Sequence, residues 1–167
     1  MFTSIDQFDK IWTLESGKTR QIFSALTDES LGQQVGPEFR TLGRLAWHIV
    51  QSVVWSATET KLGIEGPGDD VPVPNSAARI KQTYERVAEA IGKKIGEKWQ
   101  DSTLEIEDEI VGQKWKRGFT LYVLVSHEIH HRAQMTVLMR QAGLKVPGVY
   151  GPALEEWGQY GAAPPVI

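Results

Sequence analysis

The pattern of apolar and polar residues along the chain predicts four long helices joined by polar connections. Apolar residues recur every three or four positions, the spacing of one helix face, over about Ser4–Leu26, Thr41–Gly63, Ser76–Trp99 and Gly118–Ala142. Each of the first three segments opens near a serine, threonine or asparagine, residue types that cap helix N-termini. The last segment ends at Gly143, and glycine readily takes the left-handed conformation common after a helix.

The connections between these segments contain the residues that interrupt helices. Residues 27–39 are polar and glycine-containing, so we expect a loop with at most one helical turn. Residues 66–74 hold several prolines and glycines and cannot be helical. Residues 102–115 mix branched apolar residues with acids, which indicates a short extended segment. The tail from residue 144 is rich in glycine and proline and is expected to be irregular, with one short turn at residues 153–157.

The predicted architecture is therefore all-α. Four long helices with short to medium connections favour a four-helix bundle with a short irregular C-terminal tail. We find no internal repeat and no boundary for a second domain, so residues 1–167 are expected to form a single domain. The connections are long enough for a crossover between parallel helices, so a simple up-and-down order is not required.

The composition excludes several classes of function. Apolar residues make up 41% and charged residues 23% of the chain, and its net charge is −3, so nothing favours nucleic-acid binding. The chain has no cysteine, which excludes disulfides, thiolate metal ligands and a cysteine nucleophile. The N-terminal residues lack the pattern of a signal peptide, and the apolar runs are too short to span a membrane. We expect a cytoplasmic protein without nucleic-acid or membrane partners.

The candidate chemistry lies in the last helical segment, which contains three of the four histidines. His127 and His131 are four residues apart, so on a helix they project from the same face and can bind one divalent transition metal. His130 points about 60° away from His127 and is expected to lie at the surface or to make a hydrogen bond. The fourth histidine, His48, lies in the second helical segment. If these two helices are neighbours, three imidazoles form a metal site with at least one open position.

A pocket is expected beside these histidines. In the second segment, one helix face carries polar groups among apolar residues, and Gln134 continues the histidine face of the fourth segment. We therefore expect Ser52, Trp55, Glu59 and Gln134 to line the pocket. The alternative is that each histidine is a hydrogen-bonded core residue, which is the commoner role of a lone histidine. The clustering favours the metal site, because neutral imidazoles are costly to bury unpaired.

The same stretch also matches the H-E-x-x-H pattern of zinc metalloproteases, in which Glu128 would act as general base. The extended form of that pattern has glycine and histidine at the positions of Gln134 and Val137, and both are absent. A glutamate in the tail, Glu155 or Glu156, could supply a third ligand, but the chain lacks the strands of a protease substrate site. The protease is a remote alternative. We expect Glu128 and Arg132 to form a solvated ion pair on the helix flank.

Three stretches resemble the DinB-like (DinB/YfiT) family. They are the Thr41-Leu42-Gly43-Arg44-Leu45-Ala46-Trp47-His48 segment, the His127-x-x-x-His131-Arg132-Ala133-Gln134 segment, and the helix exit from Gly143 to Gly151. The resemblance implies a four-helix bundle in which His48, His127 and His131 bind a divalent metal, commonly nickel or zinc. His130 does not match a ligand position of the family.

The resemblance also sets the expected range of functions. Characterised members include transferases and isomerases that use low-molecular-weight thiols such as bacillithiol, mycothiol or glutathione. We expect a metal-dependent enzyme acting on a small-molecule substrate, such as a thiol-dependent S-transferase or a related hydrolase. The alternative is a non-catalytic stress protein that binds a metal or a small ligand. The fourth helical segment is apolar on two sides, which favours a homodimer.

Overall fold

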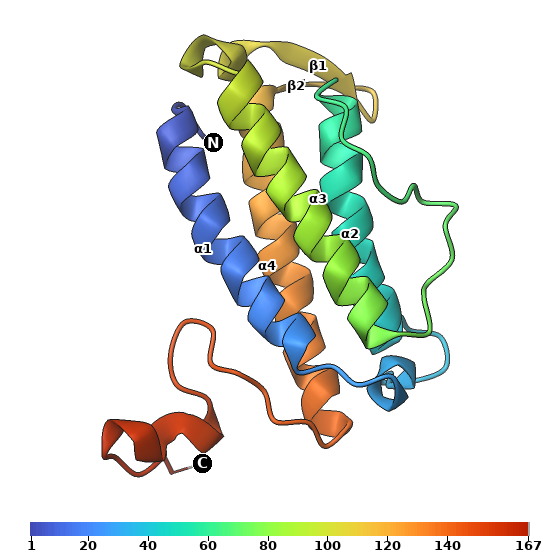
Figure 1. The fold of residues 1–167 in the computed structure, drawn as a ribbon, viewed down its shortest axis with the longest axis vertical. Coiled ribbons are helices and arrows are strands. Elements are labelled where there is room, and N and C mark those ends of the chain that lie inside the picture. Colours follow the sequence, from blue (N-terminus) through green and yellow to red (C-terminus); the bar gives the residue numbers. More distant parts are fainter. Residues whose placement is uncertain (167) are drawn as a thin grey trace.

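Four long helices form the body of the protein in the computed structural model, which describes residues 1–166 (Figure 1). They are α1 (Ile5–Ser24), α2 (Leu42–Glu59), α3 (Ala77–Lys98) and α4 (Arg117–Gln141). The predicted all-α four-helix bundle with an irregular C-terminal tail is confirmed.

Local sequence signals account for the ends of these helices. The side chains of Ser4, Thr41 and Ser76 each accept a hydrogen bond from a backbone N–H in the first turn of α1, α2 and α3. These bonds satisfy donors that have no partner inside the helix. After α4, Gly143 has a φ of 75°, a left-handed conformation that glycine adopts without steric cost.

The helices do not follow a simple up-and-down order. The neighbouring pairs are α2 with α4, α1 with α3, α2 with α3 and α1 with α4, so α1 and α2 lie diagonally opposite. Figure 1 shows α2 and α3 running in the same direction, joined by a long connection along the outside of the bundle. Because α2 runs antiparallel to α4, the first half of α2 lies against the second half of α4.

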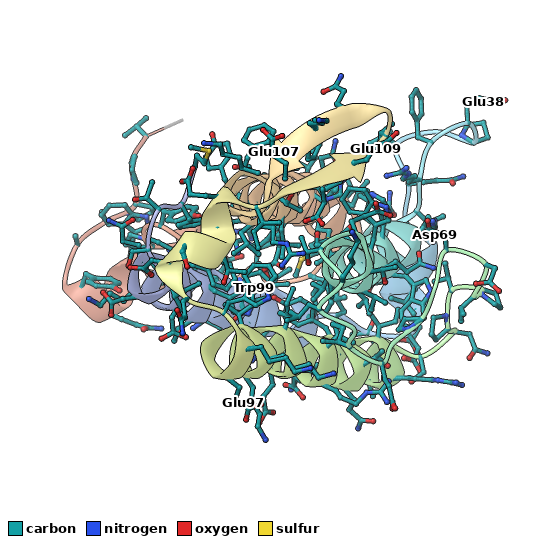
Figure 2. The ribbon with its side chains drawn as sticks, turned by 90° about the horizontal axis from the view of Figure 1, so that it is seen from above. Glu38, Asp69, Glu97, Trp99, Glu107 and Glu109 are labelled. Atoms are coloured by element: carbon teal, nitrogen blue, oxygen red, sulfur yellow. The ribbon has the colours of Figure 1, made fainter. Side chains whose placement is uncertain are left out.

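The connection between α2 and α3 is fixed to the outer face of α2. The Trp47 indole Nε1 donates to the Val71 carbonyl at 3.0 Å, and the Gln51 side-chain amide donates to the Gly68 carbonyl at 2.6 Å. Prolines in residues 66–74 prevent this segment from forming a helix. These bonds hold Asp69 at the rim of the bundle (Figure 2).

Residues 101–116 form more regular structure than the expected short extended segment. A 3₁₀ turn, η2 (Asp101–Glu105), precedes an antiparallel hairpin of β1 (Glu107–Ile110) and β2 (Gln113–Lys116). The two-residue turn between the strands has positive φ at both positions, 50° at Val111 and 72° at Gly112. Seen from above, the hairpin lies across the end of the bundle, beside α4 (Figure 2).

The remaining connections match their prediction closely. One 3₁₀ turn, η1 (Glu29–Gly32), lies between α1 and α2, and another, η3 (Leu154–Tyr160), lies in the tail. The tail turn continues three residues beyond the expected end at residue 157. None of the helices in residues 1–166 combines the length and the apolar character needed to cross a lipid bilayer.

The core lies between the four helices and fixes the spacing of α2 and α4. Fully buried apolar side chains come from every helix, including Phe8, Ile49, Ile80 and Met135. Burial of a side chain of this size stabilises the fold by about 1.5–3 kcal/mol. This packing holds the facing surfaces of α2 and α4 in place, and those surfaces carry the histidines.

Candidate metal centre

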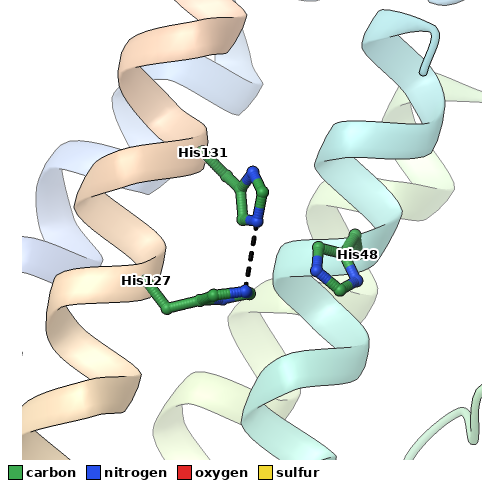
Figure 3. A group of neighbouring side chains, drawn as sticks. All are labelled: His48, His127 and His131. Carbon is green, nitrogen blue, oxygen red and sulfur yellow. Dashed lines mark hydrogen bonds between the residues drawn. The ribbon is translucent and has the colours of Figure 1, made fainter. Parts of the chain in front are cut away.

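Three histidines from two helices converge at one point between α2 and α4 (Figure 3). His127 and His131 lie one turn apart on α4, and His48 faces them from α2. One nitrogen from each ring can be chosen so that all three lie within 4.8 Å of one another. The ring of His48 lies 5.0 Å from that of His127 and 4.8 Å from that of His131, centroid to centroid. The structure thus brings together the three proposed ligands.

The spacing of the nitrogens suits a shared metal ion. The Nε2 atoms of His127 and His131 lie 3.1 Å apart. Two imidazole nitrogens bound to one ion at about 2 Å lie roughly 2.9–3.4 Å from each other, depending on the coordination geometry. The pair on α4 therefore already has the separation of two ligands on a single ion, and a small movement of His48 would complete a three-nitrogen set.

Gln134 orients one of these rings. Its Oε1 lies 2.7 Å from Nδ1 of His131, one turn further along α4. An amide oxygen can only accept, so Nδ1 carries the proton and Nε2 keeps its lone pair for a metal. Hydrogen bonds of this kind orient metal-binding histidines and fix their tautomer. The predicted position of Gln134 beside the histidines matches the structure, but its role is to support His131 rather than only to line a pocket.

The surroundings keep all three imidazoles neutral near pH 7. Burial is the largest cause and lowers the pKa of His48 to about 3 and that of His127 to about 4. Burial also lowers the pKa of His131, although the hydrogen bond with Gln134 opposes this shift. The positive charge of Arg40 lowers the pKa of each of the three. Only a neutral imidazole can bind a metal, so the ligands are ready to bind without losing a proton.

His130 occupies a different position. Its side chain is exposed, and its ring meets that of His131 edge-on, with centroids 4.9 Å apart. Among the described residues it is not part of the group of side chains that could hold a metal. Its surface location matches the expectation from helix geometry.

A cavity of about 240 Å³ opens beside His48 and His127. Ser52 and Trp55 line it, as predicted, but Glu59 does not. The Ser52 hydroxyl donates to the backbone carbonyl of His48 at 2.7 Å, so its oxygen remains free to accept a hydrogen bond from a ligand. The other lining residues are Ser56, Asp69, Val123 and Leu124.

The connections between the helices also contribute to the site, which the sequence did not predict. Asp69, between α2 and α3, reaches the cavity beside His48, and Arg40, just before α2, lines a second cavity beside His131. Neither residue follows a helical period. The nearest signal is the proline-rich segment around Asp69, whose rigidity indicates a fixed position but not which helix it contacts.

The expected solvated ion pair between Glu128 and Arg132 is wrong. Both side chains are buried, with exposed fractions of 2% and 1%. Glu128 accepts hydrogen bonds of 2.7 Å from Thr19 of α1 and Tyr84 of α3. Burial raises the pKa of its carboxyl, and these two bonds oppose the rise. Arg132 instead pairs with the buried carboxylate of Glu15 on α1.

This arrangement argues against metalloprotease chemistry. Glu128 points toward α1 and α3 rather than toward α2, so its carboxylate does not join His48 at the histidine site. In the tail, Glu155 pairs with Arg140, and Glu156 accepts hydrogen bonds from backbone N–H groups of the tail. No carboxylate of the described residues joins the three histidines.

Comparison with known proteins gives consistent matches over nearly the whole chain. The profile of the DinB family matches residues 1–162. The uncharacterized protein YrdA of Bacillus subtilis is 43% identical over 165 residues, which is 99% of each chain. A crystal structure of a DinB-like protein from Bacillus cereus aligns with a TM-score of 0.87 at 43% identity, covering 90% of this chain and 100% of that one. For YjoA, a DinB-like protein of Bacillus subtilis, the TM-score is 0.67 at 18% identity over 86% and 96% of the chains, a likeness of fold alone.

Proposed function

The chain belongs to the DinB family, and from this premise we propose that it binds a divalent transition metal, nickel or zinc, through His48, His127 and His131. The observation that carries the proposal is the convergence of three neutral imidazoles, two of them with Nε2 atoms 3.1 Å apart. Nitrogen ligands suit both metals. Three protein ligands leave at least one position open, as in catalytic rather than purely structural sites.

We further propose that the protein is a metal-dependent enzyme, with thiol-dependent S-transfer or a related hydrolysis as its reaction. A bound divalent metal would supply Lewis acidity, which lowers the pKa of a thiol or a water molecule at the open position. A low-molecular-weight thiol as co-substrate is consistent with the absence of cysteine from the chain, since the nucleophile then comes from a small molecule.

The residues around the cavity beside His48 can hold such a small molecule. Trp55 and Leu124 provide apolar walls, which exclude water from a bound ligand. The Ser52 oxygen can accept a hydrogen bond, and the Asp69 carboxylate can bind a positively charged group at the rim. The cavity therefore suits a small molecule with an apolar part and a cationic or hydrogen-bonding group.

The test is a comparison of zinc- or nickel-loaded protein with its His127→Ala variant. Both are incubated with a panel of low-molecular-weight thiols and electrophiles, and loss of free thiol and hydrolysis of the electrophiles are measured. The proposal predicts thiol consumption by the loaded wild type and none above background by the variant. Metal binding without thiol consumption or hydrolysis across the panel would favour the alternative, a non-catalytic protein that binds metal or a small ligand.

A further inference from the structure

A second cavity lies on the other side of the histidine site. Its volume is about 460 Å³, and His131 and Gln134 form one wall. The rest of the lining comes from the second half of α4, the start of α2 and the loop before α2. The two cavities thus adjoin the same three histidines, one beside His127 and one beside His131.

One cationic side chain lines this second cavity. Arg40 lies in the loop before α2, is exposed, and makes no hydrogen bond or ion pair with any other residue in the part of the chain that the structure describes. Arg44, one turn into α2, instead donates to Gln51 at 2.7 Å. The guanidinium of Arg40 is therefore available to a ligand, whereas that of Arg44 is already engaged.

The position of Arg40 creates an electrostatic conflict with a bound metal. Arg40 and His131 line the same cavity, so the guanidinium lies beside the histidine site. A divalent cation at the histidine site would stand close to this guanidinium, and like charges at short range in a partly buried site repel each other. An anion between them would be attracted to both cations and would relieve the repulsion.

The other walls of this cavity determine what kind of anion fits. Phe39, Leu45, Val137 and Leu138 are apolar, and no acidic residue is among the lining. An inorganic anion would leave these apolar surfaces exposed to water. A ligand with an apolar body would cover them, and its binding would be favoured by about 25 cal/mol for each Å² of apolar surface buried. A guanidinium binds a planar carboxylate through two parallel hydrogen bonds.

We propose that this cavity binds a small organic carboxylate whose charged end lies between Arg40 and the three-histidine site and whose apolar body packs against Phe39, Leu45 and Val137. This inference rests on the proposed metal site and adds a substrate class to it. The cavity beside His127 has the opposite character, since Asp69 lines it, and would receive the second reactant. Arg40 is assigned a binding and positioning role.

The test measures how a carboxylate and a metal affect each other's binding. Zinc affinity is measured by chelator competition with and without octanoate, and octanoate affinity is measured by isothermal titration. Octanoate should raise the zinc affinity of the wild type about tenfold, and zinc should raise octanoate affinity by the same factor because linkage is reciprocal. In Arg40→Gln, zinc alone should bind roughly threefold tighter, since the repulsion is gone. The effect of octanoate should be lost.

Matched controls separate this site from general charge effects. Arg79→Gln removes one exposed arginine from α3 and should behave as the wild type, and Arg40→Lys should retain part of the coupling. Acetate lacks the apolar body and octanamide lacks the charge, so neither should reproduce the effect of octanoate. Equal octanoate coupling in Arg40→Gln and wild type, or an equal effect of acetate, would overturn the proposal.

The outcome also distinguishes this proposal from the proposed metal function. If zinc fails to bind, the metal site is wrong, and octanoate is titrated into the metal-free protein. Binding that Arg40→Gln weakens would then still support the carboxylate site, whereas equal binding by both proteins would overturn it. Thermal unfolding of each variant checks the fold. Because Arg40 is an exposed loop residue, its substitution should leave the midpoint temperature near that of the wild type.

Discussion

Neighbouring side chains in residues 127–132 face different sides of α4 and have different surroundings. His127 and His131 face α2, whereas Glu128 and Arg132 face α1 and α3. The spacing of four residues predicted the histidine pair, because that relation holds within any helix. The same rule failed for Glu128 and Arg132, because it treats the helix as isolated and solvated. The apolar character of α4 on two sides was the signal that charges on its back would be buried and paired.

Arg132 should be essential for stability rather than for metal binding. Its guanidinium donates to the Glu15 backbone carbonyl at 2.9 Å, to Thr19 at 3.0 Å and to Tyr150 of the tail at 3.0 Å, and it pairs with the Glu15 carboxylate. Arg132→Met would leave that buried carboxylate with only the Tyr150 hydroxyl and the more distant Lys18 ammonium as partners. It should lower the free energy of unfolding by about 3 kcal/mol, measured by urea denaturation.

A matched control is available on the same helix. Arg140 pairs with Glu155 at the surface, where water screens the charges. Arg140→Met should therefore change the free energy of unfolding much less than Arg132→Met does. Similar losses in both variants would mean that the buried network around Glu15 is not what gives Arg132 its effect.

Glu128→Gln should leave metal affinity close to that of the wild type. The glutamine oxygen can still accept the hydrogen bonds from Thr19 and Tyr84, and the side chain remains directed toward α1 and α3 rather than toward His48. Isothermal titration with zinc is the measurement. If Glu128→Gln lowered the affinity as much as His127→Ala, Glu128 would have to contact the metal, which would favour the protease interpretation.

At the scale of elements, the helices followed from the sequence and the hairpin did not. Apolar periodicity and capping residues are local, so they predict where α1 to α4 begin and end. Residues 102–115 are too short and too acidic for a periodic signal. Asp108, on β1, is nevertheless buried, because Arg117 donates to its carboxylate at 2.8 and 3.2 Å. A partner on the following helix cannot be read from the strand itself.

The hairpin turn offers a test at this scale. Val111 has a φ of 50° and an exposed fraction of 83%, so its side chain gains little from packing while its backbone is strained. Val111 and Gly112 both have positive φ, as in a type I′ turn, for which Asn-Gly is preferred. Val111→Asn should raise the free energy of unfolding by roughly 1 kcal/mol. Val111→Ala keeps the strain of a residue with a Cβ and should give a smaller gain; equal gains would argue against the turn as the cause.

At the scale of the whole molecule, helix order and assembly were the least predictable features. Residue spacing does not determine whether α2 and α3 run parallel, although the length of their connection allowed it. Residue spacing could join His48 to the pair on α4 only on the condition that the two helices are neighbours, and the resemblance implied that they are. The expected homodimer stays a prediction. Leu121 and Val125, on the back of α4, are already buried within one chain, so this surface does not require a partner. Light scattering at micromolar concentration tests the expected dimer, and a monomeric mass would contradict it.

The stability of the metal-free protein should depend on pH through its histidines. The pKa of His48 is about 3 in the folded state and 6.5 in the unfolded state, so between these values the unfolded chain binds the additional proton. This contribution to stability is present above pH 6.5 and is lost as the pH falls toward 3. Free imidazoles take up protons, and so lose their metal, as the pH falls through about 6.5. Because the pKa values of His48 and His127 are lowered, protons should compete with the metal only at a much lower pH.

The measurement is the midpoint of thermal unfolding at pH 7 and pH 5, with a chelator present. The raised pKa of Glu128 has the opposite effect, since it makes the folded state more stable as the pH falls. The wild type is therefore compared with His48→Asn, in which the contribution of Glu128 is unchanged. Between pH 7 and pH 5, the midpoint temperature of the wild type should fall further than that of His48→Asn. Identical losses would show that His48 is not held neutral by the fold.

The central claim is that His48, His127 and His131 form one metal site, and isothermal titration with zinc or nickel at pH 7 tests it most directly. His48→Ala, His127→Ala and His131→Ala should each lower the affinity by orders of magnitude, because two imidazoles hold a divalent ion poorly. His130→Ala should bind as the wild type does, since its exposed side chain lies outside the cluster. Loss of binding in His130→Ala with normal binding in His48→Ala would contradict the three-histidine site.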